Sequence, residues 1–138
     1  MTYDPDNIFG KILRGEIPCH RIYEDEHTLA FMDVMPMVEG HCLVIPKEGS
    51  RGLLDAKPEV LHQVMATVQK VARAAVTAFD AEGFQIRQYN EPAAGQTVFH
   101  LHVHILPLKE GQRPAPHVGG MADHAVLARQ AEKVRAAL

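Results

Sequence analysis

Apolar residues recur at two spacings along this chain, and each spacing predicts a different kind of element. From Pro58 to about Phe79 they fall at positions i, i+3, i+4 and i+7, which places them on one face of a long helix. A shorter helix is expected over residues 8–13 with Asn7 as its N-terminal cap, and a last helix after Asp123. Short apolar runs between turn-forming residues predict five strands, at about residues 20–23, 28–33, 41–45, 84–90 and 99–105.

The order of these elements predicts the fold class. Strands follow one another with few helices between them and are joined partly by short turns, so we expect an antiparallel α+β domain. The chain has 138 residues and contains no internal repeat, low-complexity tract or linker. A single domain spanning residues 1–138 is therefore expected.

Composition excludes some functions. An apolar fraction of 46% and a charged fraction of 22% are typical of soluble globular proteins. The formal net charge of -3 gives no general attraction for nucleic acid, and no apolar run reaches the roughly 18 residues that a membrane span needs. The first residues lack the basic-then-apolar pattern of a signal peptide, so we expect a cytoplasmic protein in which Cys19 and Cys42 form no disulfide.

Three histidines at alternate positions, His100, His102 and His104, are the most informative polar feature. Alternate side chains of a strand point to the same face, so all three imidazoles are expected together. Histidine has an ordinary pKa of roughly 6.5, and this row therefore concentrates groups that can transfer protons, attack phosphorus or bind metal near neutral pH. The alternative is an exposed strand face that carries three histidines without a chemical role. The opposite face is expected to join the core through Phe99, Leu101, Val103 and Ile105.

Other polar residues fall where they could join the histidines. The loop residues Gly95, Gln96 and Thr97 directly precede the row and offer hydrogen-bond donors to a phosphate. His41 begins one predicted strand and Asn90 ends another, so either could project into the same cleft. For His41 taken alone, a satisfied surface or core histidine is the favoured interpretation, and Asp33, taken as an isolated acid before a Met-Pro turn, is typical of a turn cap.

Two chemical uses of the histidine row compete. Histidines at alternating strand positions can chelate zinc, usually together with a carboxylate or another histidine. The acids nearest in sequence are Glu91 and Glu110, on loops beyond the strand. The other use is nucleophilic attack on phosphorus by an imidazole, with neighbouring groups binding the phosphate oxygens. The lack of a carboxylate nearby in the sequence favours this second use.

The histidine row also resembles the signature of a known family. Residues 100–106, His-Leu-His-Val-His-Ile-Leu, resemble the motif of the histidine triad (HIT) family. The similarity extends to Asn90 and to further segments in the same order, at residues 8–12, 15–18, 29–34, 40–47 and 95–99. It covers about residues 7–108 and leaves residues 109–138 as a C-terminal loop and helix. The resemblance implies a HIT-like fold, a five-stranded antiparallel sheet with one long helix and short flanking helices, assembled as a homodimer through the long helix and the neighbouring sheet.

The resemblance also implies a reaction that needs no metal and no cofactor. His102 would be the nucleophile that becomes nucleotidylated on an α-phosphate, and His104 would hydrogen-bond the phosphate or assist the leaving group. The backbone of His100 would hold the nucleophile in its reactive tautomer, and the His100 ring and His41 would complete the polar network. The implied protein is a purine nucleotide hydrolase or transferase, of the phosphoramidate or dinucleoside polyphosphate type.

Substrate contacts are implied in the same way. Asn90, Gln96 and Thr97, with the Gly95 bend, would contact the phosphate or the leaving group. Asp33 would accept hydrogen bonds from the ribose hydroxyls. The purine base would lie in an apolar slot formed by Ile8, Phe9, Ile17, Val34 and Leu43. For these residues a place in the hydrophobic core is an equal alternative.

Departures from the family pattern leave the substrate open. Thr97 stands where many relatives have serine, and Leu106-Pro107 stands where one branch often has two glycines. The residues for an N-terminal Cys-pair zinc site, present in some bacterial relatives, are absent from the sequence, as is the tryptophan that shapes the leaving-group pocket in others. The tail after Gly111 matches no assigned feature, and its His117 and His124 are interpreted as structural or surface residues. The alternatives to the implied enzyme are a metal-dependent hydrolase and a nucleotide-binding regulatory module.

Overall fold

The computed structural model describes residues 2–116 and 120–138. In chain order the elements are α1 (Ile8–Leu13), β1 (Arg21–Glu24), β2 (Thr28–Met32), β3 (Cys42–Pro46), α2 (Pro58–Ala78), β4 (Gly83–Arg87), the 3-10 helix η1 (Pro92–Ala94), β5 (Val103–Leu108) and α3 (His124–Ala137). The predicted helices are confirmed: Asn7 and Asp123 accept main-chain N–H hydrogen bonds at the starts of α1 and α3, and Pro58 lies in the first turn of α2.

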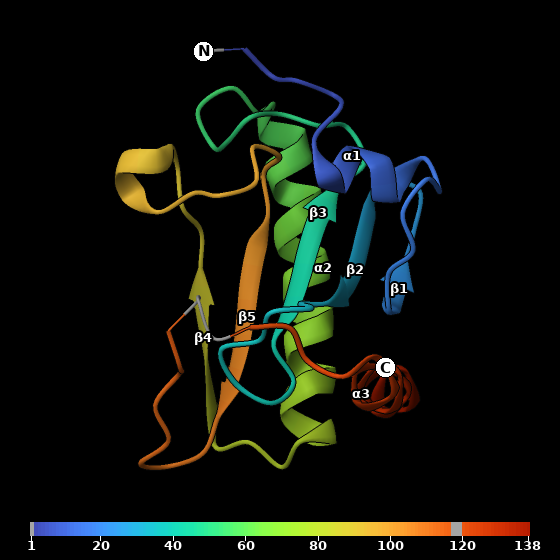
Figure 1. Ribbon diagram of the computed structural model, residues 1–138, viewed down its shortest axis with the longest axis vertical. Coiled ribbons are helices and arrows are strands. Elements are labelled where there is room, and N and C mark those ends of the chain that lie inside the picture. Colours follow the sequence, from blue (N-terminus) through green and yellow to red (C-terminus); the bar gives the residue numbers. More distant parts are fainter. Residues whose placement is uncertain (1, 117–119) are drawn as a thin grey trace.

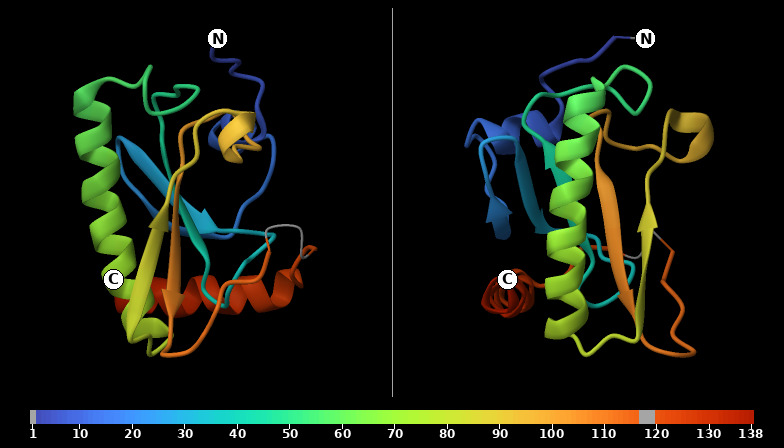
Figure 2. Two further views of the ribbon diagram at one scale, coloured as in Figure 1. Left: turned by 90° about the vertical axis from the view of Figure 1, so that its left-hand side faces the viewer. Right: turned by 180° about the vertical axis from the view of Figure 1, so that it is seen from behind.

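The five strands form one sheet in the order β1-β2-β3-β5-β4, and every neighbouring pair is antiparallel. Figure 1 shows α2 running along the back of the sheet, and Figure 2 shows α3 lying across one end. The opposite face of the sheet is covered in part by α1. This arrangement confirms the predicted α+β class and the five-stranded antiparallel sheet.

Alternation along the strands divides their side chains between two cores. In β2, Ala30 and Met32 pack with α2 and α3, whereas Leu29 and Phe31 pack with Phe9 of α1. The α2 side also receives Cys42, Val44, Val103 and Ile105, and the α1 side receives Leu43 and Ile45. The even-numbered residues around β5 therefore lie on the α1 side, where the ring of Phe9 meets the ring of His102.

The structure corrects the predicted limits of the histidine strand. Strand β5 begins at Val103, so His100 and His102 precede it, with His100 in a bend over residues 98–100. Here the main chain pairs with a loop, because the N–H of Leu101 donates to the carbonyl oxygen of Ser50 over 2.9 Å. Phe99 was expected in the core but is only half-buried, and the Arg51 guanidinium lies 4.2 Å from its ring centre.

The ends of the sheet differ in composition. Edge strand β1 is short and carries charged residues at both ends, Arg21 and Glu24. Edge strand β4, which ends at Arg87 rather than at the predicted residue 90, exposes Phe84 and Ile86. The unpaired main chain of an edge strand can pair with another chain, and exposed apolar side chains on that strand favour such an association.

None of the helices described in residues 2–116 and 120–138 is long and apolar enough to cross a membrane. The cytoplasmic location stays a prediction.

Candidate active site

His102 is held by the main chain two residues before it. Its Nδ1 lies 2.6 Å from the carbonyl oxygen of His100, and its side chain is almost completely buried. A carbonyl oxygen can only accept a hydrogen bond, so Nδ1 carries the proton and donates it. In the neutral ring the lone pair then lies on Nε2. This is the tautomer that a nucleophilic imidazole requires.

The ring of His100 is fixed on both sides. Nε2 donates to the carbonyl oxygen of Pro46 over 2.9 Å, which leaves Nδ1 to accept from the hydroxyl of Tyr3 over 2.8 Å. Burial lowers the pKa of His100 below its ordinary value, although the hydrogen bond to Pro46 acts in the opposite direction. His100 is therefore a neutral, oriented ring.

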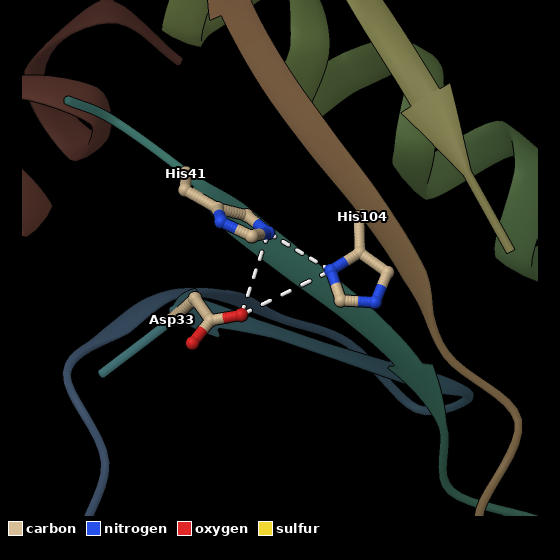
Figure 3. Close-up of side chains that lie close together, drawn as sticks. All are labelled: Asp33, His41 and His104. Atoms are coloured by element: carbon tan, nitrogen blue, oxygen red, sulfur yellow. Dashed lines mark hydrogen bonds and ion pairs between the residues drawn. The ribbon is translucent and has the colours of Figure 1, made fainter. Parts of the chain in front are cut away.

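His41, His104 and Asp33 form a second buried group, whose side chains converge in Figure 3. Nε2 of His41 lies 2.8 Å from Nδ1 of His104 and 3.4 Å from Oδ2 of Asp33. The main-chain N–H of Met37 donates to Nδ1 of His41 over 3.0 Å, so the proton of neutral His41 must be on Nε2. His41 then donates to Nδ1 of His104, and the proton of His104 lies on Nε2.

The position of Asp33 corrects the inference drawn from sequence distance. No carboxylate is near the histidines in sequence, yet Oδ2 of Asp33 lies 3.9 Å from Nδ1 of His104. Strands β2 and β3 pair with Met32 opposite Cys42, and the N–H of Asp33 donates to the carbonyl oxygen of His41 over 2.9 Å. The register of this strand pair could have revealed the contact, because it places residues 33 and 41 side by side.

The same three side chains could be considered as metal ligands, because one ligand atom from each lies within 4.8 Å of the others. A metal-bound histidine normally donates its other ring N–H to an acceptor. His41 does the reverse, since its Nδ1 accepts from the N–H of Met37. A metal on Nε2 would require a doubly deprotonated ring or the loss of that hydrogen bond. The donor set therefore fits a hydrogen-bonded relay and does not fit a metal centre.

The predicted phosphate loop is tied to the loop that follows β3. The amide of Gln96 donates to the carbonyl oxygens of Arg51 and Val98 and accepts from the N–H of Glu91, over 2.7, 3.0 and 2.7 Å. Oδ1 of Asn90 accepts from the N–H of Leu53 over 2.8 Å. These two amides hold the loops together, which is a structural role that the sequence did not predict. Thr97 and Gly95 are exposed, and Gly95 has a φ of 95°, in the left-handed region.

The predicted apolar slot is brought together only in part. The rings of Phe9 and His102 have their centres 5.0 Å apart, and Leu43 packs in the same cluster as Phe9. Val34 directly follows Asp33 and is 36% exposed, whereas Ile8, the first residue of α1, is 48% exposed. Ile17 is half-buried. Phe9 and Leu43 therefore form the wall beside the histidines.

Sequence reasoning missed two tyrosines beside the histidines and an arginine beside the predicted phosphate loop. Tyr3 binds His100, the ring centre of Tyr89 lies 5.5 Å from that of His104, and Arg51 forms an ion pair with Glu91 at 2.7 Å. No local motif marks these positions, because each contact joins segments far apart in the chain. Of the two tail histidines, His124 lies on the surface beside His20, whereas His117 lies outside the described residues.

Comparison with known proteins places this geometry in a family. Residues 14–111 match the HIT domain family. Adenylylsulfatase HINT3 of Arabidopsis thaliana is 39% identical over 109 residues, which cover 79% of this chain but only 55% of the plant protein. A solved Hit-like protein of Bartonella henselae, involved in cell-cycle regulation and bound to an unknown ligand, is 50% identical over 99% of both chains with a TM-score of 0.93. A zinc-bound histidine triad protein of Mycobacterium smegmatis is 36% identical over 96% of this chain and 92% of its own, with a TM-score of 0.85. The chain belongs to the HIT family.

Proposed function

We propose that the protein is a nucleotide hydrolase or transferase that cleaves the α-phosphate bond of a purine nucleotide through a nucleotidylated His102. The observation that carries the proposal is the 2.6 Å contact between Nδ1 of His102 and the carbonyl oxygen of His100. It places the lone pair of a buried imidazole on Nε2. A second polar ring, His104, has its centre 4.9 Å from that of His102.

The reaction proceeds in two displacements. Nε2 of His102 attacks the α-phosphorus, and the bond from phosphorus to the leaving group breaks. The leaving group departs with the electron pair and takes a proton from solvent. Water then attacks the phosphorus and gives up a proton to solvent, the bond to Nε2 breaks, and the electron pair returns to His102 as the nucleoside monophosphate is released. Splitting one displacement into two lowers the barrier of each.

The hydrogen bond between His41 and His104 indicates a role for His104, the third histidine of the row. Since Nδ1 of His104 accepts from His41, the proton of the neutral ring lies on Nε2, and we assign that Nε2–H as a donor to a phosphate oxygen of the substrate. A fixed donor stabilises the negative charge that gathers on those oxygens in the transition state. Assistance to the leaving group by the same ring is the alternative role.

Nucleotide recognition is proposed for the groups around these rings. The carboxylate of Asp33 accepts from the N–H of Met35 over 2.8 Å, and we assign it the ribose hydroxyls as donors when the nucleotide is bound. The wall of Phe9 and Leu43 would contact the base, together with Ile8, Ile17 and Val34. Thr97 and Gly95 would contact the phosphate. For Asn90 and Gln96 a contact with the substrate stays a prediction.

The proposal is tested by release of the nucleoside monophosphate in the presence of a chelator. Adenosine phosphoramidate, a dinucleoside polyphosphate and adenylyl sulfate differ only in the group that leaves the α-phosphorus, so their relative rates identify the branch. Mass spectrometry of protein quenched in alkali, which preserves the phosphorus–nitrogen bond, should show one added nucleotidyl group on His102. Activity restored only by zinc or manganese would favour a metal-dependent hydrolase, and tight nucleotide binding without turnover would favour a regulatory module.

We also propose that the protein is a homodimer. Edge strand β4 exposes Phe84 and Ile86, and α2 exposes Met65 to a similar extent, at 46%, 45% and 47%. An antiparallel pairing of β4 with its copy would cover these apolar side chains and the edge of the sheet. Light scattering on the intact protein and on Ile86→Lys tests this, with a dimer expected for the first and a monomer for the second. A monomeric intact protein would contradict the proposal.

A further inference from the structure

A tyrosine near the N-terminus reaches the ring of His100. The hydroxyl of Tyr3 donates to Nδ1 of His100 over 2.8 Å and accepts from Nδ2 of Asn7 over 3.2 Å. Asn7 is itself fixed, because its Oδ1 accepts from the N–H of Gly10 as the cap of α1. The N-terminal segment, helix α1 and the first triad histidine are thereby joined by side-chain hydrogen bonds.

Gly49 allows this approach. A Cβ built on Gly49 would lie 2.2 Å from Oη of Tyr3 and 3.0 Å from Cε1 of His100, so a larger residue would displace one of the two rings. The rings of Tyr3 and His100 pack edge to face with centres 5.5 Å apart. Tyr3, Asn7, Gly49 and His100 are named here the tyrosine clamp.

The clamp is connected to the nucleophile through a single residue. The ring of His100 is held by Tyr3 on one nitrogen and by the Pro46 carbonyl on the other, while the His100 carbonyl oxygen accepts from Nδ1 of His102. Holding the ring therefore holds the carbonyl that selects the tautomer of His102. Strand pairing does not do this, because β5 begins only at Val103, and between His100 and His102 the main chain is held by the hydrogen bond from the N–H of Leu101 to the carbonyl oxygen of Ser50.

We propose that Tyr3 is a positioning residue for the nucleophile: its hydroxyl fixes His100, and His100 in turn keeps the lone pair of His102 on Nε2. The inference rests on the proposed function of His102. Tyr3 hydrogen-bonds Nδ1 of His100, which is not among the groups proposed to contact the nucleotide, so its effect belongs to the chemical step rather than to nucleotide binding. A solvated histidine prefers its proton on Nε2, and a loosened His100 carbonyl lets His102 return toward that unreactive form.

Two variants test the clamp in opposite ways. Tyr3→Phe keeps the ring and removes the hydroxyl, whereas Gly49→Ala keeps the hydroxyl and displaces it. Their matched controls are Tyr23→Phe, which removes a hydroxyl that hydrogen-bonds Asp25, and Gly83→Ala, whose added Cβ meets nothing within 4 Å. Each is measured by steady-state kinetics on the best of the three adenosine substrates. The ring nitrogens of His100 and His102 are followed by nitrogen-15 NMR.

Both clamp variants should lower kcat about 10-fold, the scale of a misplaced reacting group, with KM changed less than about twofold. The His102 signals should move from a pure Nδ1–H tautomer toward a mixture, and the controls should resemble the intact protein. Unchanged kcat and an unchanged His102 tautomer in Tyr3→Phe would overturn the proposal. An intact protein without turnover would contradict the proposed function instead, and the NMR tautomers would still decide whether the clamp orders His102.

Discussion

Among the described residues, histidines gather in the buried site and at a surface pair, and the two regions differ in what determines the position of the ring protons. In the buried group, the rings of His41, His100 and His102 each meet a main-chain N–H or carbonyl that can only donate or only accept. On the surface, Nε2 of His20 lies 2.9 Å from Nδ1 of His124, and either ring can be the donor. The nitrogen–nitrogen distance is 2.8 Å between the buried rings of His41 and His104 and 2.9 Å between the surface rings of His20 and His124, but only the buried rings have an assigned tautomer.

The difference shows what burial adds to histidine chemistry. A buried ring must satisfy both nitrogens, and a folded main chain offers partners of fixed polarity, so each ring has one tautomer. Among the described residues, no buried side-chain nitrogen or oxygen is without a hydrogen-bond partner. At the surface, partial burial and the neighbouring His124 lower the pKa of His20, but water can supply a partner for any tautomer.

The largest difference between the two groups should appear on replacing the nucleophile. His102→Asn removes the atom that attacks phosphorus, and turnover should fall on the order of 10³-fold or more, measured as nucleoside monophosphate release. The nucleotidyl group that mass spectrometry detects on the intact protein should be absent from this variant. His62→Asn, an exposed position on α2, is the control and should keep full turnover. A His102→Asn protein that turns over at the intact rate would contradict the assignment.

Removing His41 should damage both stability and activity. His41→Ala leaves a buried ring and a buried carboxylate without their shared partner, which should cost about 1–3 kcal/mol in the free energy of unfolding by urea. Loss of an oriented donor at His104 should also lower kcat by about 10-fold or more. A fully active His41→Ala protein would show that the His104 tautomer does not depend on His41.

The buried group should also respond to acid. Burial holds the pKa of His100 below its ordinary value of 6.5, so below that pH the unfolded chain takes up a proton that folded His100 does not. This contribution makes the folded state less stable as the pH falls from 7 through 6.5 toward the lower folded pKa. Urea unfolding across this range and an NMR titration of the His100 ring measure it. Titration of His100 at or above its ordinary value would contradict the prediction.

The smallest effect is expected at the surface pair. His124→Asn removes one ring of the contact with His20 at an exposed position, so the free energy of unfolding should change by no more than about 0.5 kcal/mol. Turnover should be unchanged, and the pKa of His20 should rise toward its ordinary value because the electrostatic effect of His124 is lost. A large loss of stability would show that this pair fastens α3 to the sheet.

Much of the fold could be predicted because its signals are local. The spacing of apolar residues in α2 and the caps Asn7 and Asp123 are read within a few positions, and the three α-helices and strands β1, β2 and β3 were found near their predicted limits. The ends of β4 and β5 could not be predicted, since they depend on which loop the main chain pairs with. Phe99 is apolar and was expected in the core, but its ring lies against the guanidinium of Arg51 from another loop.

The sequence alone determined the family and the spacing of the three histidines at every second residue, because a motif and an alternating pattern are both properties of neighbouring residues. Only the tertiary structure decided the protonation pattern of His100 and His104, because their ring protons are assigned by groups distant in the chain: Pro46 for His100, and His41 for His104. Asp33 changed from an isolated turn residue to the carboxylate beside these rings for the same reason. Hydrogen bonding is directional and short-ranged, so the chemistry of an imidazole is settled only when folding brings its partners within about 3 Å.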